Sequence, residues 1–194
     1  MLVAPGQFTV SMYKRVDGDP TDLGQSQSFD VVSIREPTLP GSSQEQRVVF
    51  DNQVHELARA TEGTIKTIDA IVGELEAAKE SLLSSTADPS LYETANSIQQ
   101  RVQAERDRLT NNETRQRYKE LDEMTVTARV FHAQFEPTSA YGPTPSQRES
   151  LRIARDLYDD VSRQLSNLVD VEYAGLKVAL DAAGVPWSPG RGIQ

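Results

Sequence analysis

The sequence predicts a mainly α-helical protein, an antiparallel up-down bundle of three to four long helices with a β-hairpin appendage at the N-terminus. Three observations support this class. A seven-residue apolar repeat runs through residues 50–82, two later segments carry apolar stripes of helical period, and the connections between them are short. Short connections make successive helices antiparallel. We expect residues 1–41 to form the hairpin and a linker, and residues 42–194 to form the bundle.

The first forty residues have the pattern of two strands. Apolar and polar residues alternate from Phe8 to Tyr13, and the turn-rich segment 17–24 leads to a second apolar run at Phe29, Val31, Val32 and Ile34. A lone hairpin is marginally stable in water, so it either packs on the helices or is the remnant of a sheet whose other strands precede Met1. We favour the remnant of a preceding domain.

The first helix is predicted to begin at Ser42 or Ser43 and to end near Ser84. Ser43 and Gln46 match a capping box. The heptad positions that follow predict a stripe facing a partner helix, in this chain or in a second copy. These positions are Phe50, Val54, Leu57, Thr61, Thr64, Ile68, Ile71, Leu75, Ala78 and Leu82. Gly63 and Gly73 mark either the close approach of a neighbour or tolerated exposed sites.

Two further helices are predicted in the middle of the chain. Asp88 and Pro89 provide an N-cap and a first helical residue for a helix that runs back along the first. Its stripe consists of Leu91, Ala95, Ile98, Val102 and Leu109. Residues 113–135 keep only an approximate helical period, with a break near Met124 and Thr125.

The last helix is predicted to begin at Pro145, with Thr144 as its cap and Gln147 reaching back. Gly184, Val185 and Pro186 provide its C-terminal stop. Its predicted core positions are Leu151, Ala154, Tyr158, Val161, Leu165, Leu168, Leu176, Ala179 and Ala183. Trp187 is expected to seal the end of the bundle rather than to stack on a ligand.

Composition excludes several classes of partner. With 20 Lys and Arg against 29 Asp and Glu, the net charge of -9 disfavours nucleic acid. The most basic stretch, residues 101–119, interleaves six basic with three acidic residues, the pattern of a solvated, internally paired face. No stretch approaches the roughly 20 apolar residues of a membrane span, and the N-terminus has no signal-peptide pattern. The chain has no cysteine, which excludes disulfides, thiolate metal sites and a thiol nucleophile and leaves the compartment open.

No motif predicts chemistry, so we assign no catalytic, cofactor-binding or metal-binding residue and expect no cofactor. A di-metal site in a bundle needs Glu three residues before each His, whereas His55 follows Asn52 and His132 follows Arg129. There is no nucleophile elbow. Adjacent carboxylates on helices diverge into solvent. This applies to Asp159 with Asp160, and to Glu120, Asp122 and Glu123. Asn112, Glu113 and Thr114 form a glycosylation sequon by pattern alone.

Three stretches carry a resemblance to a known family. They are the strand that begins Ala4-Pro5-Gly6, the long first helix, and residues 143–191 with their Gly-Val-Pro-Trp-Ser-Pro-Gly-Arg end. Together they resemble the C-terminal region of bacterial sortilin-like, BNR-repeat β-propeller proteins, often labelled glycosyl hydrolases. The resemblance implies that a propeller and an Ig-like domain precede this chain and that it is extracellular or periplasmic. No catalytic residue of the family maps onto these stretches.

Three hypotheses for function follow. The first is a non-catalytic helical accessory domain that docks on its own upstream propeller or another protein, or forms a homodimer through the seam of the first helix. The second is a contribution to a glycan-processing hydrolase whose chemistry lies mainly in the propeller. The third is a free-standing adaptor with an acidic surface. Alanine changes at His55, His132 and Asp159 would discriminate the second from the first.

Overall fold

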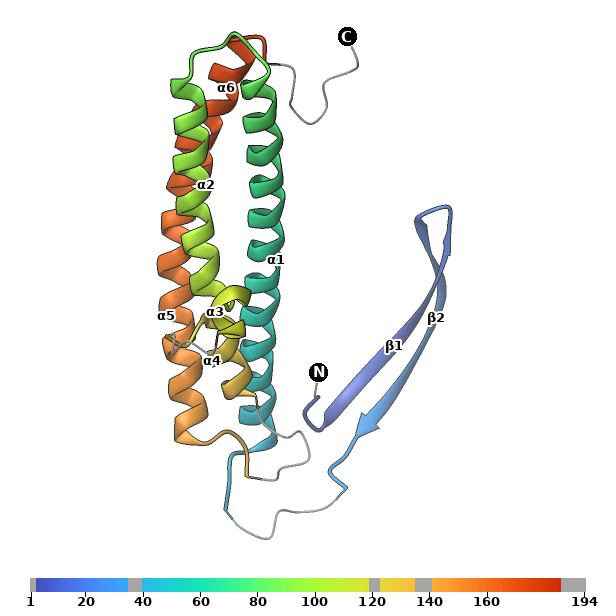
Figure 1. The fold of residues 1–194 in the computed structure, drawn as a ribbon. Coiled ribbons are helices and arrows are strands. Elements are labelled where there is room, and N and C mark those ends of the chain that lie inside the picture. Colours follow the sequence, from blue (N-terminus) through green and yellow to red (C-terminus); the bar gives the residue numbers. More distant parts are fainter. Residues whose placement is uncertain (1–2, 35–39, 119–122, 135–140, 186–194) are drawn as a thin grey trace. The chain divides into compact units, whose positions relative to one another are not determined.

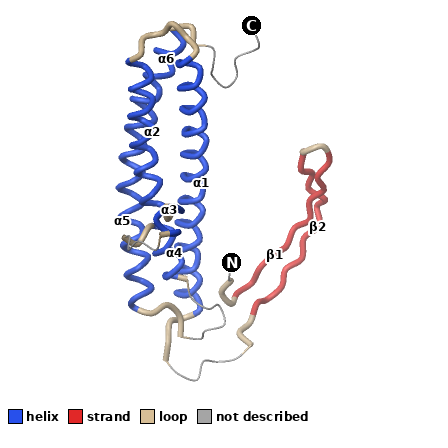
Figure 2. The backbone as a smooth tube through the Cα atoms, viewed as in Figure 1, coloured by secondary structure: helices blue, strands red, loops and turns tan. Residues whose placement is uncertain are grey.

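The computed structural model describes residues 3–34, 40–118, 123–134 and 141–185 (Figure 1). Helices make up most of the described chain, and the two strands of an antiparallel hairpin come first in the sequence (Figure 2). This confirms the predicted mainly helical class with an N-terminal hairpin. The chain forms two compact units: a hairpin unit, Met1–Gln53 with Gln134–Thr144, and a helical unit, Val54–Ala133 with Pro145–Gln194. The domain boundary predicted after residue 41 falls inside the first unit and stays a prediction.

The hairpin consists of β1 (Gly6–Val16) and β2 (Asp19–Val31), joined by a two-residue turn. Asp17 and Gly18 both have positive φ, 50° and 97°, the combination that an Asp-Gly hairpin turn requires. The turn predicted over residues 17–24 was therefore too long. Residues 19–24 belong to β2, and residues 19–22 pair with β1, because the single Asp-Gly dipeptide is enough to reverse the chain.

An irregularity inside the ladder explains why the sequence of β2 resembles a loop. The pairing shifts between Ser11 and Tyr13, where Gly24 has a φ of 64° and donates its N–H to Oδ1 of Asp22 at 2.9 Å. A bulge of this kind admits extra residues without ending the strand. Val32 and Ile34, predicted in the second strand, lie beyond its end.

The helix α1 (Gln44–Leu83) begins with the predicted capping box. Ser43 Oγ accepts the N–H of Gln46 at 3.2 Å, and Gln46 Oε1 accepts the N–H of Ser43 at 3.1 Å. Nine of the ten predicted seam positions are buried, and the tenth, Thr64, is half-buried. The chain itself therefore covers most of this seam.

The helix α2 (Ser90–Leu109) runs antiparallel to α1. Asp88 caps it as predicted, since its Oδ1 accepts the N–H of Ser90 at 2.9 Å. Two polar pairs fix the direction: Gln99 Nε2 donates to Glu76 Oε1 at 3.2 Å, and Arg106 Nε donates to Asp69 Oδ1 at 2.7 Å. Later residues of α2 thus meet earlier residues of α1.

The segment predicted as one interrupted helix over residues 113–135 forms two separate short helices. These are α3 (Glu113–Arg117), capped by Asn112, and α4 (Val126–Ala133), where Thr125 Oγ1 accepts the N–H of Ala128 at 3.3 Å. The predicted break near Thr125 is confirmed, but the helical span around it was overestimated. Tyr118 and residues 123–125 are not helical, and the side chain of Thr125 begins a new helix instead of continuing one.

The last helical column consists of α5 (Pro145–Asn167), the π-helical segment η1 (Leu168–Tyr173) and α6 (Ala174–Ala182). Its start at Pro145 is confirmed. At its end, Gly184 has a φ of 68° and the N–H of Val185 donates to the carbonyl of Leu180 at 3.1 Å. This geometry is the predicted glycine stop, in which the left-handed residue closes the last turn.

The π-helical segment changes which residues of this column are buried. Six predicted core positions are buried: Leu151, Ala154, Val161, Leu165, Leu168 and Leu176. Tyr158 and Ala179 are half-buried, and Ala183 is exposed. Tyr173 and Leu180 are buried instead, because the wider turn shifts the inward-facing stripe by one residue after Leu168. The burial predicted for Ala183 was therefore wrong. Trp187 lies outside the described residues.

Candidate interaction surfaces

The ionisable residues considered for catalysis do not form a common site. His132 is exposed in the last turn of α4, His55 is half-buried on α1, and Asp159 is exposed on α5. Among the described residues, no group of three or more metal-ligating side chains could hold an ion. Glu120 and Asp122 lie outside that set, and Glu123 is exposed.

Asp160 has a structural partner. Its Oδ2 accepts from Arg108 at 2.6 Å, and its Oδ1 accepts from Arg163 at 3.1 Å. The bond from Arg108, which also pairs with Glu105, holds the pKa of Asp160 below its ordinary value. A carboxylate that is ionised and engaged in this way ties α2 to α5 and is a poor proton donor.

A second cluster joins α1 to the π-helical segment. The hydroxyl of Tyr173 donates to Glu74, whose carboxylate also lies 3.6 Å from Nζ of Lys177. Burial, with the hydrogen bond to Glu74, raises the pKa of Tyr173 above its ordinary value. The ammonium group of Lys177 lies 4.9 Å from the centre of the Tyr173 ring. These contacts satisfy the polar end of a buried side chain and stabilise the packing.

A hollow of about 610 Å³ lies between α4 and the first turns of α5. His132, Arg129 and Glu149 are among its lining residues. However, both carboxylate oxygens of Glu149 accept from Arg152, at 2.6 and 2.9 Å, so Glu149 is held as an ion by a neighbour on its own helix. Among the described residues that line this hollow, Glu149 is therefore poorly suited to proton transfer.

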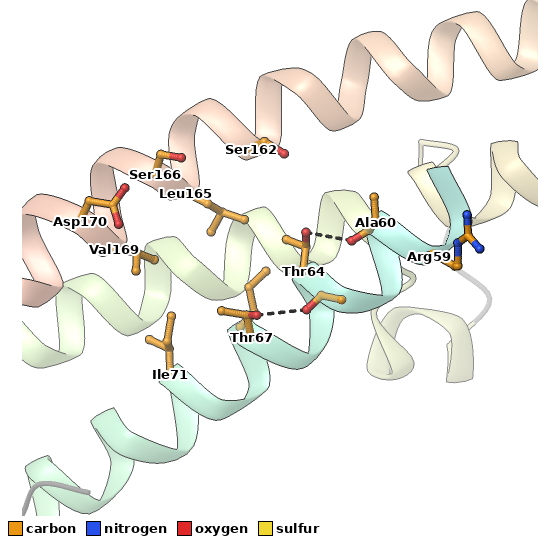
Figure 3. A pocket seen from close by; sticks show the side chains of 12 residues that line it. Arg59, Ala60, Thr64, Thr67, Ile71, Ser162, Leu165, Ser166, Val169 and Asp170 are labelled. Atoms are coloured by element: carbon orange, nitrogen blue, oxygen red, sulfur yellow. Dashed lines mark hydrogen bonds between the residues drawn. The ribbon is translucent and has the colours of Figure 1, made fainter. Parts of the chain in front are cut away.

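A groove of about 410 Å³ runs between α1 and the α5–η1 column within the helical unit (Figure 3). Its floor is apolar and its walls carry small side chains from both helices. Arg59 lies at one end and Asp170 at the other, as Figure 3 shows. Gly63 lies in the α1 wall, and a Cβ atom built on it meets nothing within 4 Å. Close packing against the described chain therefore does not explain this glycine.

One face of the hairpin is apolar, and its side chains are half-buried or exposed. Phe8 pairs directly with Phe29, their rings stacking with centroids 6.2 Å apart, and Val10 follows on the same face. Val10 is 58% exposed and Phe29 is 48% exposed. On the opposite face Thr9 and Ser28 share a hydrogen bond of 2.9 Å between their hydroxyls. The described ribbon is thus amphipathic, with one apolar and one polar face.

The sequon asparagine has a structural role. Asn112 Oδ1 accepts the N–H groups of Thr114 and Arg115, at 3.0 and 3.2 Å, and caps α3. Its Nδ2, the atom to which a glycan would attach, donates to Asp107 at 2.8 Å. Both ends of the amide are therefore engaged in the folded chain.

Comparison of the chain with protein-family models, curated proteins and solved structures finds no match. None of the described helices combines the length and the apolarity that crossing a membrane requires.

The sequence predicted the apolar face of the hairpin but not the groove between α1 and the α5–η1 column. Alternation from Phe8 onward predicted a strand with one apolar face, which is the face that the structure leaves exposed. The groove was not predicted, and the sequence left Gly63 open between the close approach of a neighbour and a tolerated exposed site. The groove is formed by two segments about a hundred residues apart in sequence, so no local pattern marks it.

Proposed function

We propose that this chain is a non-catalytic accessory module that docks onto another protein segment through its hairpin. The observation that carries the proposal is the uncovered apolar face of β1 and β2. A two-stranded ribbon gains little stability alone, and long strands with free edges pair readily with other strands. A β-rich surface would supply both a cover for the apolar face and partners for the edges.

The resemblance to sortilin-like propeller proteins supports a specific setting for this docking. In that setting, the module follows a propeller and an Ig-like domain in an exported polypeptide, and the hairpin completes the Ig-like sheet. The helices then act as an up-down bundle that supports the hairpin and carries no chemistry of its own. The engagement of Asp160 and Glu149 by arginines agrees with a non-catalytic role.

The test compares the chain with a longer version that includes the sequence encoded upstream of Met1. We expect hydrogen exchange of the amides in β1 and β2 to slow by at least about tenfold in the longer chain, because their edges and apolar face become covered. Val10→Thr should reduce that protection, whereas Thr9→Val, on the polar face, should leave it largely intact. Unchanged exchange, or a stop codon in frame directly before Met1, would refute this setting.

Activity provides a second arm of the same test. If the longer protein hydrolyses a glycan, alanine changes at His55, His132 and Asp159 should leave its kcat/KM within about twofold. A loss of a hundredfold or more at any of the three would place the chain in the active site.

A further inference from the structure

We propose that the groove between α1 and the α5–η1 column binds the same groove of a second copy, forming a two-fold symmetric dimer. The inference concerns only the helical unit and is independent of the docking proposed for the hairpin. It rests on the shape of the groove, on the glycine in its wall and on the charges at its two ends.

The groove has the form of a slot for another helix. It extends from Arg59 to Ile71 along α1, about 18 Å at 1.5 Å per residue. The apolar surface of the groove comes from Ile68, Ile71 and Leu165. All three side chains are more than 90% buried, so only a shallow apolar strip is exposed in the groove. A helix that enters must approach closely, which small wall residues allow.

The wall residues of α1 permit that approach. Gly63 and Thr67 lie one turn apart, and Thr67 Oγ1 donates to the carbonyl of Gly63 at 3.1 Å, so the hydroxyl is already satisfied (Figure 3). Thr64 does the same with Ala60 at 3.0 Å. An approaching helix therefore meets methyl groups and a glycine rather than polar groups that need new partners. Glycine costs about 1 kcal/mol relative to alanine in a helix interior, and no described neighbour accounts for Gly63.

The charges at the two ends of the groove favour a second copy of the chain as its occupant. Arg59 and Asp170 are both exposed, and among the described residues the side chain of neither takes part in a hydrogen bond or an ion pair. Asp170 lines the groove at the level of Ile71 on α1. If α1 of a second copy lies antiparallel in the groove, its Arg59 reaches the Ile71 end and meets Asp170. Two-fold symmetry then forms the same pair at the other end.

The same arrangement places Gly63 of one copy opposite Thr67 of the other, since both lie equally far from the ends of the groove. Small residues therefore face each other where the two α1 helices are closest. A contact of this length is well below the size of a standard stable interface, so we expect a dissociation constant in the micromolar range.

The test is the mass of the chain in solution. In light scattering from about 10 to 500 µM, the mean mass should rise from 21.5 kDa toward twice that value, and added salt should weaken the association. Arg59→Asp and Asp170→Arg should each weaken association at least about tenfold, because each brings like charges together. The double variant should restore it. Both residues are exposed, so the variants should retain the circular dichroism of the parent chain.

Glycine variants provide a matched control. Gly63→Leu should abolish the dimer by filling the groove, whereas Gly73→Leu, at an exposed α1 site where an added Cβ also meets nothing, should not. Val10→Thr in the hairpin should leave the mass unchanged. A chain that stays monomeric to 500 µM, a double variant that fails to restore association, or a dimer abolished by Val10→Thr and unaffected by Gly63→Leu would each overturn the proposal.

Discussion

At the scale of single residues, glycine has opposite roles at different positions in this chain. Gly142 has a φ of 77°, and a Cβ there would lie 2.7 Å from Cβ of Ser42 and 2.9 Å from Cγ of Arg47. Gly73, in the middle of α1, has open space around it. The first position requires glycine for both its backbone and its neighbours, and the second does not.

We therefore predict that Gly142→Ala destabilises the contact between residues 141–142 and the start of α1 by roughly 1–3 kcal/mol. The Ser42 amide donates to the carbonyl of Tyr141 at 3.0 Å, so its hydrogen exchange reports on this contact and should accelerate. Gly73→Ala is the control and should stabilise the chain by about 1 kcal/mol through helix propensity. Equal effects of the two substitutions would contradict this account.

At the scale of an element, the π-helical segment decides which face of the last column is buried. From Leu168 the next buried residue is Tyr173, five positions on, followed by Leu176 and Leu180 at ordinary helical spacing. One extra residue in a wider turn explains this shift, because an α-helix places inward positions three or four apart.

Removing one exposed residue from this turn should thus restore an ordinary α-helix. We predict that a chain lacking Val171, which is 62% exposed, folds with unchanged helical circular dichroism and a Tm within about 5 °C of the parent. Deletion of Ser162 in α5 is the matched comparison. It rotates every later residue by about 100° and should lower the Tm by 10 °C or more. The account fails if both deletions are equally disruptive.

At the scale of the whole molecule, ion pairs connect the helices of the helical unit. Arg101 donates to both carboxylate oxygens of Glu172, at 2.5 and 2.9 Å, and Arg108 pairs with Asp160 across the same two elements of structure, α2 and the last column. Such solvent-accessible pairs contribute little to stability individually. Their chief effect is to fix the register of antiparallel neighbours and to make stability depend on pH.

The sign of that dependence follows from Asp160. Its pKa is lowered in the folded chain, so the folded state binds fewer protons than the unfolded state as the solution is acidified. The stabilisation is present above the unfolded pKa of about 3.9 and is lost as pH falls through the lower folded value. We predict that urea unfolding shows stability falling below about pH 4 and that Asp160→Asn shows a smaller fall. An identical acid dependence in both proteins would exclude this source.

Much of the fold could be predicted from the sequence because its signals are local. The capping box at Ser43, the Asp88 cap and the glycine stop at Gly184 each depend on residues within one or two turns. The seam of α1 follows from periodicity alone, which is why its burial was predicted almost position by position.

The tertiary structure decided what local signals leave open. The π turn arises where packing against other helices outweighs regular spacing, so Tyr173 and Leu180 replaced Ala183 in the core. The observed turn, Asp17 and Gly18, is shorter than the predicted one because strand pairing continues through a bulge. The strand propensities of the single residues do not predict this bulge. Both candidate surfaces depend on which side chains the remaining chain leaves uncovered. Exposure of that kind is a property of the packed molecule, whereas the amphipathic pattern of each helix and strand belongs to its sequence.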